Sequence, residues 1–180
     1  MGEAWIYDSQ GYYVLCPPYN VLGTDTPEVR VRFNAKPSSA QLKLYIVRIR
    51  VAEWFGLVAP HDVNSVDFEA CWAVVNGTNR EFSPFMPPLE KNREYSCSIT
   101  DLVQAGENTF KLHFTPSGAS IEYWVQLKII YEGASIEEVV IPSAPLDFWS
   151  GLWQFVMNNG PMIMQTLIVI MVLILLLKIL

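Results

Sequence analysis

The chain has 180 residues, of which 51% are hydrophobic and 17% charged, and its formal net charge is −6. This length is typical of one domain, and the acidic balance argues against a nucleic-acid partner, because phosphate binding requires clustered lysine and arginine. Three cysteines are too few for a disulfide framework, and two histidines without ligand spacing do not predict a zinc site. We therefore expect no metal ion and no cofactor.

Residues 1–27 are predicted to form an N-terminal extension. A secretion signal needs a basic start followed by an uninterrupted apolar stretch. Here Glu3, Asp8 and Gly11 interrupt the apolar residues, and no lysine or arginine precedes Arg30. The segment therefore does not predict export by that route.

Apolar and polar residues alternate in many short segments between residues 28 and 133. The clearest example is VRVRF over 29–33, and such alternation predicts half-buried strands. In the next segment the alternation changes phase between Ile46 and Ile49, which predicts a β-bulge near Val47. Many short strands, with no long amphipathic helix among them, predict an all-β fold and, more narrowly, a jelly-roll β-sandwich.

Two turn signals lie within this range. Asn76 and Gly77 separate two strand-like runs and predict a tight hairpin, because both residues tolerate positive φ. The same asparagine begins an NGT sequon, which matters only if the domain faces a glycosylating compartment; the turn accounts for the sequence without it. Further along, Thr100 is expected to cap one helical turn over 101–105, and Gly106 to end it in the left-handed conformation.

Single residues of chemical interest also fall in the predicted strands. Cys71 and Cys97 either form one bridge or are two free core thiols, and we favour the free thiols because unpaired cysteine is a common core residue. His113 alternates outward beside Lys111, and we expect it to be solvated.

The best candidate for a ligand-binding loop is AEWFGLVAPHDVNS, residues 52–65. Exposed aromatic rings stack on sugars, and amides or carboxylates beside them bind hydroxyl groups. The candidate ligand-binding residues of this loop are Trp54, Phe55, His61, Asp62 and Asn64. In the alternative, which we favour, Trp54 and Phe55 plug the end of the sandwich or pack on a partner.

The sequence does not predict an enzyme. It has no P-loop, no HExxH motif and no Ser-His-Asp set with supporting motifs. A glycosidase needs two carboxylates fixed across a cleft, and nothing in the sequence selects such a pair. We therefore expect a protein without catalytic residues.

Three stretches carry a resemblance to a known family: AVVNGTNREFSPF, YSCSITDLVQAGENTFKLHF and YWVQLKIIYEG. Together they resemble the galactose-binding-domain-like jelly roll over about residues 28–133. The resemblance implies that fold and, since many such domains are carbohydrate-binding modules, a glycan ligand. The matching residues build turns and core, so they do not identify the ligand.

A linker over residues 134–145 leads to an aromatic segment, residues 146–160. Apolar residues recur there at helical spacing, which predicts a short interfacial helix over 146–157 that ends at the Asn-Asn-Gly of 158–160. The residues expected at the membrane interface are Phe148, Trp149, Leu152, Trp153 and Phe155. In the alternative, this helix packs on the domain or on a neighbouring subunit.

Residues 161–180 are predicted to cross a membrane. Their only strongly polar residues are Gln165, Thr166 and Lys178. Twenty helical residues span about 30 Å, the thickness of a hydrocarbon core. The alternative, a buried core helix, requires a domain large enough to surround it.

These observations predict a single-pass, non-enzymatic, membrane-anchored jelly roll with a structural or assembly role. A subunit of a membrane complex, or of a virion that contains a membrane, fits this description. The expected partners are the lipid bilayer and neighbouring protein subunits. The alternative is a surface carbohydrate-binding (adhesion) module with a glycan partner. Lys178 near the C-terminus favours an outward-facing domain, while the lack of a signal opposes it, so the side of the membrane stays open.

Overall fold

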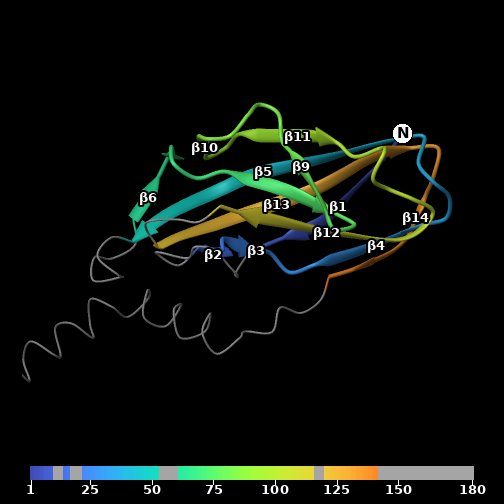
Figure 1. The fold of residues 1–180 in the computed structure, drawn as a ribbon, viewed down its shortest axis with the longest axis horizontal. Helices are drawn as coiled ribbons and strands as arrows, with labels where there is room; N and C mark the ends of the chain where they lie inside the picture. Colours follow the sequence, from blue (N-terminus) through green and yellow to red (C-terminus); the bar gives the residue numbers. More distant parts are fainter. Residues whose placement is uncertain (10–13, 17–21, 53–60, 116–119, 142–180) are drawn as a thin grey trace, which may run out of the picture.

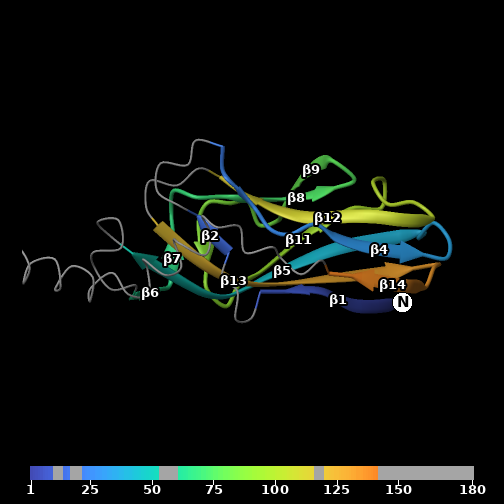
Figure 2. The same ribbon diagram turned by 90° about the horizontal axis from the view of Figure 1, so that it is seen from below.

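The computed structural model describes residues 1–9, 14–16, 22–52, 61–115 and 120–141 (Figure 1). These residues form antiparallel sheets without a helix, so the predicted all-β class is confirmed for them. Two six-stranded sheets lie face to face, an arrangement compatible with a β-sandwich (Figure 2). Within the described ranges no helix is long and apolar enough to cross a membrane. The expected interfacial helix and membrane anchor lie outside these ranges.

The first sheet, here called sheet A, has the strand order β1–β13–β5–β11. The strand β2 extends it beside β13, and β6 extends it beside β5. The bounds of these strands are β1 (Gly2–Asp8), β13 (Ser120–Glu132), β5 (Ser39–Ala52), β11 (Glu94–Ser98), β2 (Val14–Cys16) and β6 (His61–Val63).

The second sheet, here called sheet B, has the order β14–β4–β12–β8–β9, with β3 beside β12. A separate two-stranded ladder joins β7 and β10. The bounds are β14 (Ile136–Val140), β4 (Val29–Phe33), β12 (Gly106–Phe114), β8 (Cys71–Val75), β9 (Thr78–Glu81), β3 (Thr24–Asp25), β7 (Ser65–Val66) and β10 (Leu89–Glu90).

The sandwich is wider than the range 28–133 expected from the sequence. Strand β1 pairs with β13 along its length, and β14 pairs with β4 at the edge of sheet B. These strands belong to segments that we had assigned to an N-terminal extension and to a linker. The correction has a simple cause: both strands lie at sheet edges and pair with one neighbour each, so their alternation is weak.

The core fills the space between the two sheets, as the alternation predicts. The inward residues of β4, β5, β11, β12 and β13 are buried, among them Leu42, Leu44, Phe110 and Val125. The predicted bulge is also confirmed. Trp124 on β13 pairs with Arg48 and Val125 pairs with Ile46, so Val47 is the extra residue on β5. The bulge returns Ile49 to the core, where it is fully buried.

The predicted hairpin is confirmed, whereas the role of Thr100 is different. Asn76 and Gly77 have φ of 49° and 79° and join β8 to β9, and Gly106 has the expected positive φ of 85°. The Thr100 hydroxyl does not cap its own turn. It accepts a hydrogen bond from the Ala40 N–H at 2.9 Å and donates one to the Ala40 carbonyl at 3.2 Å, because the chain there runs beside the start of β5.

The two ends of the sandwich carry different connections. At one end, here called the turn end, lie the chain's N-terminus and the connections 34–38, 76–77, 99–105 and 133–135. At the other end, here called the loop end, lie β2, β6 and β7 (Figures 1 and 2). The buried thiols Cys71 and Cys97 are both free, in agreement with the alternative that we favoured.

Candidate functional site

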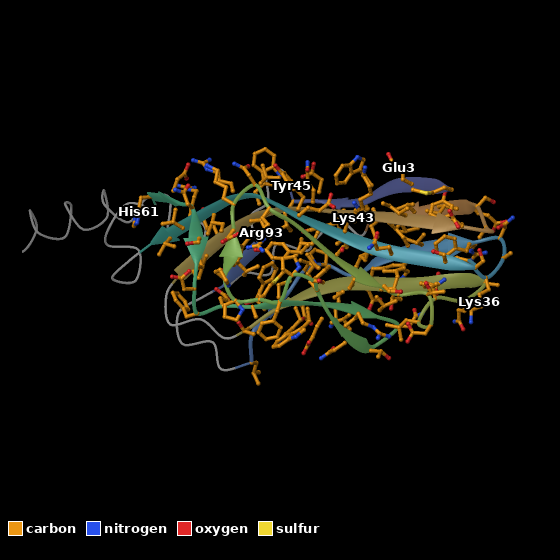
Figure 3. All side chains as sticks on the ribbon, turned by 90° about the horizontal axis from the view of Figure 1, so that it is seen from above. Glu3, Lys36, Lys43, Tyr45, His61 and Arg93 are labelled. Carbon is orange, nitrogen blue, oxygen red and sulfur yellow. The ribbon has the colours of Figure 1, made fainter. Side chains whose placement is uncertain are left out.

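A groove of about 310 Å³ runs across the outer face of sheet A. It is lined by Trp5, Lys43, Tyr45, Glu94, Gln126 and Lys128. Strand pairing places these side chains in two adjacent rows. Trp5, Lys128 and Lys43 lie opposite one another in the first row, and Gln126, Tyr45 and Glu94 in the second. Figure 3 shows Lys43 and Tyr45 on this face.

Trp5 is the most exposed aromatic side chain of the groove, and a second bulge sets its orientation. Trp5 pairs with Lys128 and Tyr7 with Leu127, so Ile6 is the extra residue on β1. The bulge lets Ile6 and Tyr7 both enter the core, while Trp5 stays outside with 56% of its surface exposed. The Lys128 ammonium lies 4.6 Å from the centre of the Trp5 ring, within cation–π range.

The charged groups around the groove already pair with one another. Lys43 Nζ lies 2.6 Å from Glu94 Oε1, and Lys128 Nζ lies 3.3 Å from Glu3 Oε2. The Gln126 side-chain amide donates to an oxygen of Asp8 at 2.9 Å. The face therefore presents aromatic surface surrounded by charged and amide side chains that each bond at least one polar neighbour.

The same face continues toward the loop end as a row of ion pairs. Arg48 pairs with Asp62 at 2.9 Å, and Arg50 pairs with Glu122 at 2.9 Å. Burial raises the pKa of the Glu122 carboxyl, and Arg50 only partly offsets this. The hydrogen bond from Arg48 lowers the pKa of Asp62. These two ion pairs thus connect β5 to its neighbours β6 and β13.

The structure separates three of the five residues expected in a sugar-binding loop from this groove. His61 and Asp62 lie on β6, where they pair with Val51 and Arg50. Asn64 is exposed just after that strand, and its carbonyl accepts a hydrogen bond from the Lys91 N–H at 2.7 Å. None of the three lines the groove.

The other candidate residues lie outside the described ranges. They are Trp54 and Phe55 in the loop, and Phe148, Trp149, Leu152, Trp153 and Phe155 at the expected membrane interface.

A second cluster lies on the outer face of sheet B and corrects our expectation for His113. Strand β3 pairs with the end of β12 and brings Asp25 beside His113. Asp25 accepts from Lys111 Nζ at 2.5 Å and lies 2.7 Å from His113 Nδ1. The His113 ring also stacks on Trp72, with ring centres 5.9 Å apart. The histidine is therefore held by two neighbours rather than simply solvated.

The electrostatics of this cluster favour an ionised carboxylate. Partial burial raises the pKa of Asp25, but the hydrogen bonds from Lys111 and His113 outweigh it and leave the pKa below its usual value. The adjoining cavity of about 350 Å³ is also lined by Glu28, Asn79 and Thr109. Among the described residues, no group of three or more His, Cys, Asp or Glu side chains is placed to hold a metal ion.

Sequence reasoning missed Trp5 and Tyr45. Tyr45 had a readable signal, because it lies at the opposite parity to its buried neighbours Leu44 and Ile46. Trp5 had none, because its exposure depends on the pairing of β1 and on the bulge at Ile6.

Comparisons with known proteins add no relative. No family model matches the chain, and no curated protein and no solved structure matches it. The functional interpretation therefore rests on the geometry of the molecule.

Proposed function

We propose that the chain is a non-enzymatic, membrane-anchored jelly-roll protein with a structural or assembly role, in which the outer face of sheet A contacts a neighbouring protein. A subunit of a membrane complex, or of a membrane-containing virion, would have this role. The observation that carries the proposal is the exposed Trp5 ring on a face whose charged groups are already paired.

This arrangement has the anatomy of a protein interface. Binding energy at interfaces is concentrated in a few aromatic or arginine side chains, and the contacts around them mainly exclude water. Trp5 and Tyr45 supply aromatic area, and the Lys43–Glu94 pair supplies a polar border. A sugar needs free hydrogen-bonding groups, whereas most of the polar groups here bond one another.

Two features support the finer assignment to the galactose-binding-like jelly roll that the sequence resembles. The described strands form two antiparallel sheets, and the Val-Asn-Gly of residues 75–77 forms the tight hairpin that the resemblance requires. This family assignment is part of the proposal.

Residues 161–180 supply the proposed anchor. Holding the sandwich at a bilayer raises the effective concentration of neighbours in the same membrane, so weak lateral contacts suffice for assembly. Deletion of residues 161–180 should release the protein from membranes. A truncated chain that still pellets with membranes after a carbonate wash would contradict the anchor.

The contact face is tested by cross-linking the full chain in its native membrane. Trp5→Ala should weaken the specific cross-linked product at least tenfold, because truncating a hot-spot aromatic costs about 2 kcal/mol or more. Trp72→Ala is the matched control, since Trp72 lies on the outer side of sheet B against His113. Equal losses in both variants, or none in Trp5→Ala, would contradict the proposed face.

A second candidate is glycan binding in the same groove. The observation that favours it is that the aromatic rings of Trp5 and Tyr45 and the amide of Gln126 line the same groove. Its volume of about 310 Å³ is near the lower end of the range for ligand pockets. A glycan array on the same material tests it. Micromolar binding that is abolished by Trp5→Ala, or by Trp54→Ala in the candidate loop, with no specific cross-linked protein, would place this function first.

A further inference from the structure

Seven large hydrophobic residues are exposed in the part of the chain that the structure describes. Met1 is at the chain terminus and Trp5 belongs to the groove on sheet A. The remaining five are Leu22, Phe68, Phe85, Val140 and Ile141. Single exposed apolar residues are common on protein surfaces. They indicate a contact surface only if several of them lie at the same part of the molecule.

Leu22 and Phe68 lie at the loop end. Leu22 comes two residues before β3, which pairs with the last two residues of β12, His113 and Phe114. Phe68 lies between β7 and β8, and the first residue of β8 also pairs with Phe114. The exposed fractions are 82% for Leu22 and 59% for Phe68.

Phe85 lies in the connection that leaves sheet B after β9. This connection leads from β9 into β10, which pairs with β7 two residues before Phe68. Phe85 is 70% exposed. Ser83, two residues before Phe85, bridges to Ser96 on β11, which pairs with Lys43 near the middle of β5. Phe85 therefore lies beside the middle of sheet A, and Phe68 is the exposed phenylalanine of the loop end.

The chain leaves the sandwich toward the same end. Strand β14 is antiparallel to β4, with Ile136 opposite Phe33 and Val140 opposite Arg30. Because β4 runs into the connection 34–38 at the turn end, β14 runs away from that end. Its last residue and the next, Val140 and Ile141, are both exposed. The proposed membrane-spanning residues, 161–180, follow from this exit.

The loop end also exposes polar residues such as Asp62 and Asp67, but the turn end carries no exposed large apolar side chain apart from Met1. Its exposed residues are polar, charged or small apart from Met1: Asn34, Lys36, Asn76, Asp101, Gln104, Glu107, Glu132 and Ser135. Figure 3 shows Lys36 there, at the opposite end of the molecule from His61. Bringing this end against a bilayer would remove water from charged groups, which is costly.

We propose that the loop end of the sandwich rests on the bilayer, with Phe68 and Leu22 inserted at the boundary between lipid headgroups and acyl chains. This inference rests on the proposed membrane anchor. Two side chains give only weak binding on their own, and the tether makes the contact persistent. The flanking charges are mixed, since Asp67 adjoins Phe68 and Arg93 pairs with Glu90, so the contact does not require anionic lipid.

This placement fixes how the groove on sheet A is oriented relative to the membrane. Sheet A lies along the long axis of the sandwich (Figure 1). With the loop end on the bilayer, its outer face points sideways, toward proteins in the same membrane. This is the direction that the proposed assembly contact needs.

The test places spin labels on the full chain in phosphatidylcholine nanodiscs. Single cysteines are introduced as Phe68→Cys and Leu22→Cys, and Lys36→Cys is the matched control at the turn end. The background carries Cys16→Ser. Cys71 and Cys97 need no replacement, because burial raises the pKa of both thiols, that of Cys97 to about 12. Each label is probed with oxygen, which concentrates in lipid, and with a water-soluble nickel chelate.

We expect the ratio of oxygen to nickel accessibility to be several-fold higher at positions 68 and 22 than at position 36. If the full chain does not float with vesicles, both the anchor and this inference fail. If it floats but the three positions give equal ratios, only the inference fails. Low accessibility to both probes at 68 and 22 would indicate a protein contact and would also overturn it.

Discussion

At the turn end, amide and hydroxyl side chains close the sandwich, whereas at the loop end the closing contacts join distant segments and leave large apolar side chains outside. The side chain of Asn108 is fully buried at the turn end. It accepts hydrogen bonds from the Gln104 N–H and from Asn76 Nδ2, and it donates to the carbonyls of Gln104 and Gly106. The residues in this network come from the connections 76–77 and 99–105 and from the start of β12.

The loop end depends on pairings across the chain. The Tyr123 hydroxyl donates to the buried carboxylate of Glu69 at 2.6 Å, and the Tyr123 ring stacks on Phe114 with ring centres 4.6 Å apart. The Thr115 hydroxyl accepts from the Ala70 N–H at 2.9 Å. The difference teaches that hydrogen bonds within the domain close the turn end without a binding partner. The other end keeps apolar surface that a partner can cover.

The largest effect is expected at the turn end. Asn108→Ala should lower the free energy of unfolding by about 3–4 kcal/mol, because four hydrogen bonds are lost and their partners are left inside the network. Glu107→Ala is the control. Glu107 is the exposed neighbour of Asn108, and its replacement should change the free energy of unfolding by no more than about 0.5 kcal/mol. Chemical denaturation followed by tryptophan fluorescence measures both. A loss below about 1 kcal/mol for Asn108→Ala would show that this network does not hold the turn end.

A smaller effect is expected at the loop end. Tyr123→Phe keeps the ring stack on Phe114 but removes the hydrogen bond to the buried Glu69 carboxylate, and we expect a loss of about 1.5–3 kcal/mol. Tyr131→Phe serves as the control, because Tyr131 is only half-buried and its contact with Phe33 is made by the ring. The same denaturation experiment applies. A Tyr123→Phe loss larger than that of Asn108→Ala would reverse the ranking of the two ends.

The smallest effect concerns pH. The pKa of Asp25 is lower in the folded protein than its usual value of about 3.8, so its contribution to stability is present above that pH and is lost as the pH falls through the lowered value. The carboxylate is partly exposed, so this contribution is at most about 1 kcal/mol. Asp25→Asn should flatten the dependence of stability on pH below about 4. An unchanged slope would mean that the clamp between β3 and β12 does not depend on this charge.

Much of the sandwich could be predicted from the sequence, because its inner strands carry period-two alternation and its hairpin carries Asn-Gly. Even the bulge at Val47 could be predicted, since it shifts the alternation in phase. Strands β1 and β14 could not, because an edge segment does not identify the strand that it joins. For the same reason the groove around Trp5 and the contact between Asp25 and His113 depend on pairings that no local pattern contains.

The central claim is that the sandwich stands on its loop end, and a height measurement tests it most directly. The 14 residues of β5 span about 45 Å at the usual rise per residue, so the two ends lie far apart along that strand. Donor dyes at Lys36→Cys or Phe68→Cys, with acceptors on the lipid headgroups of nanodiscs that hold the full chain, report each height by energy transfer. Strong transfer from position 68 with weak transfer from position 36 is the predicted result. Equal transfer from both positions, or stronger transfer from position 36, would contradict the account.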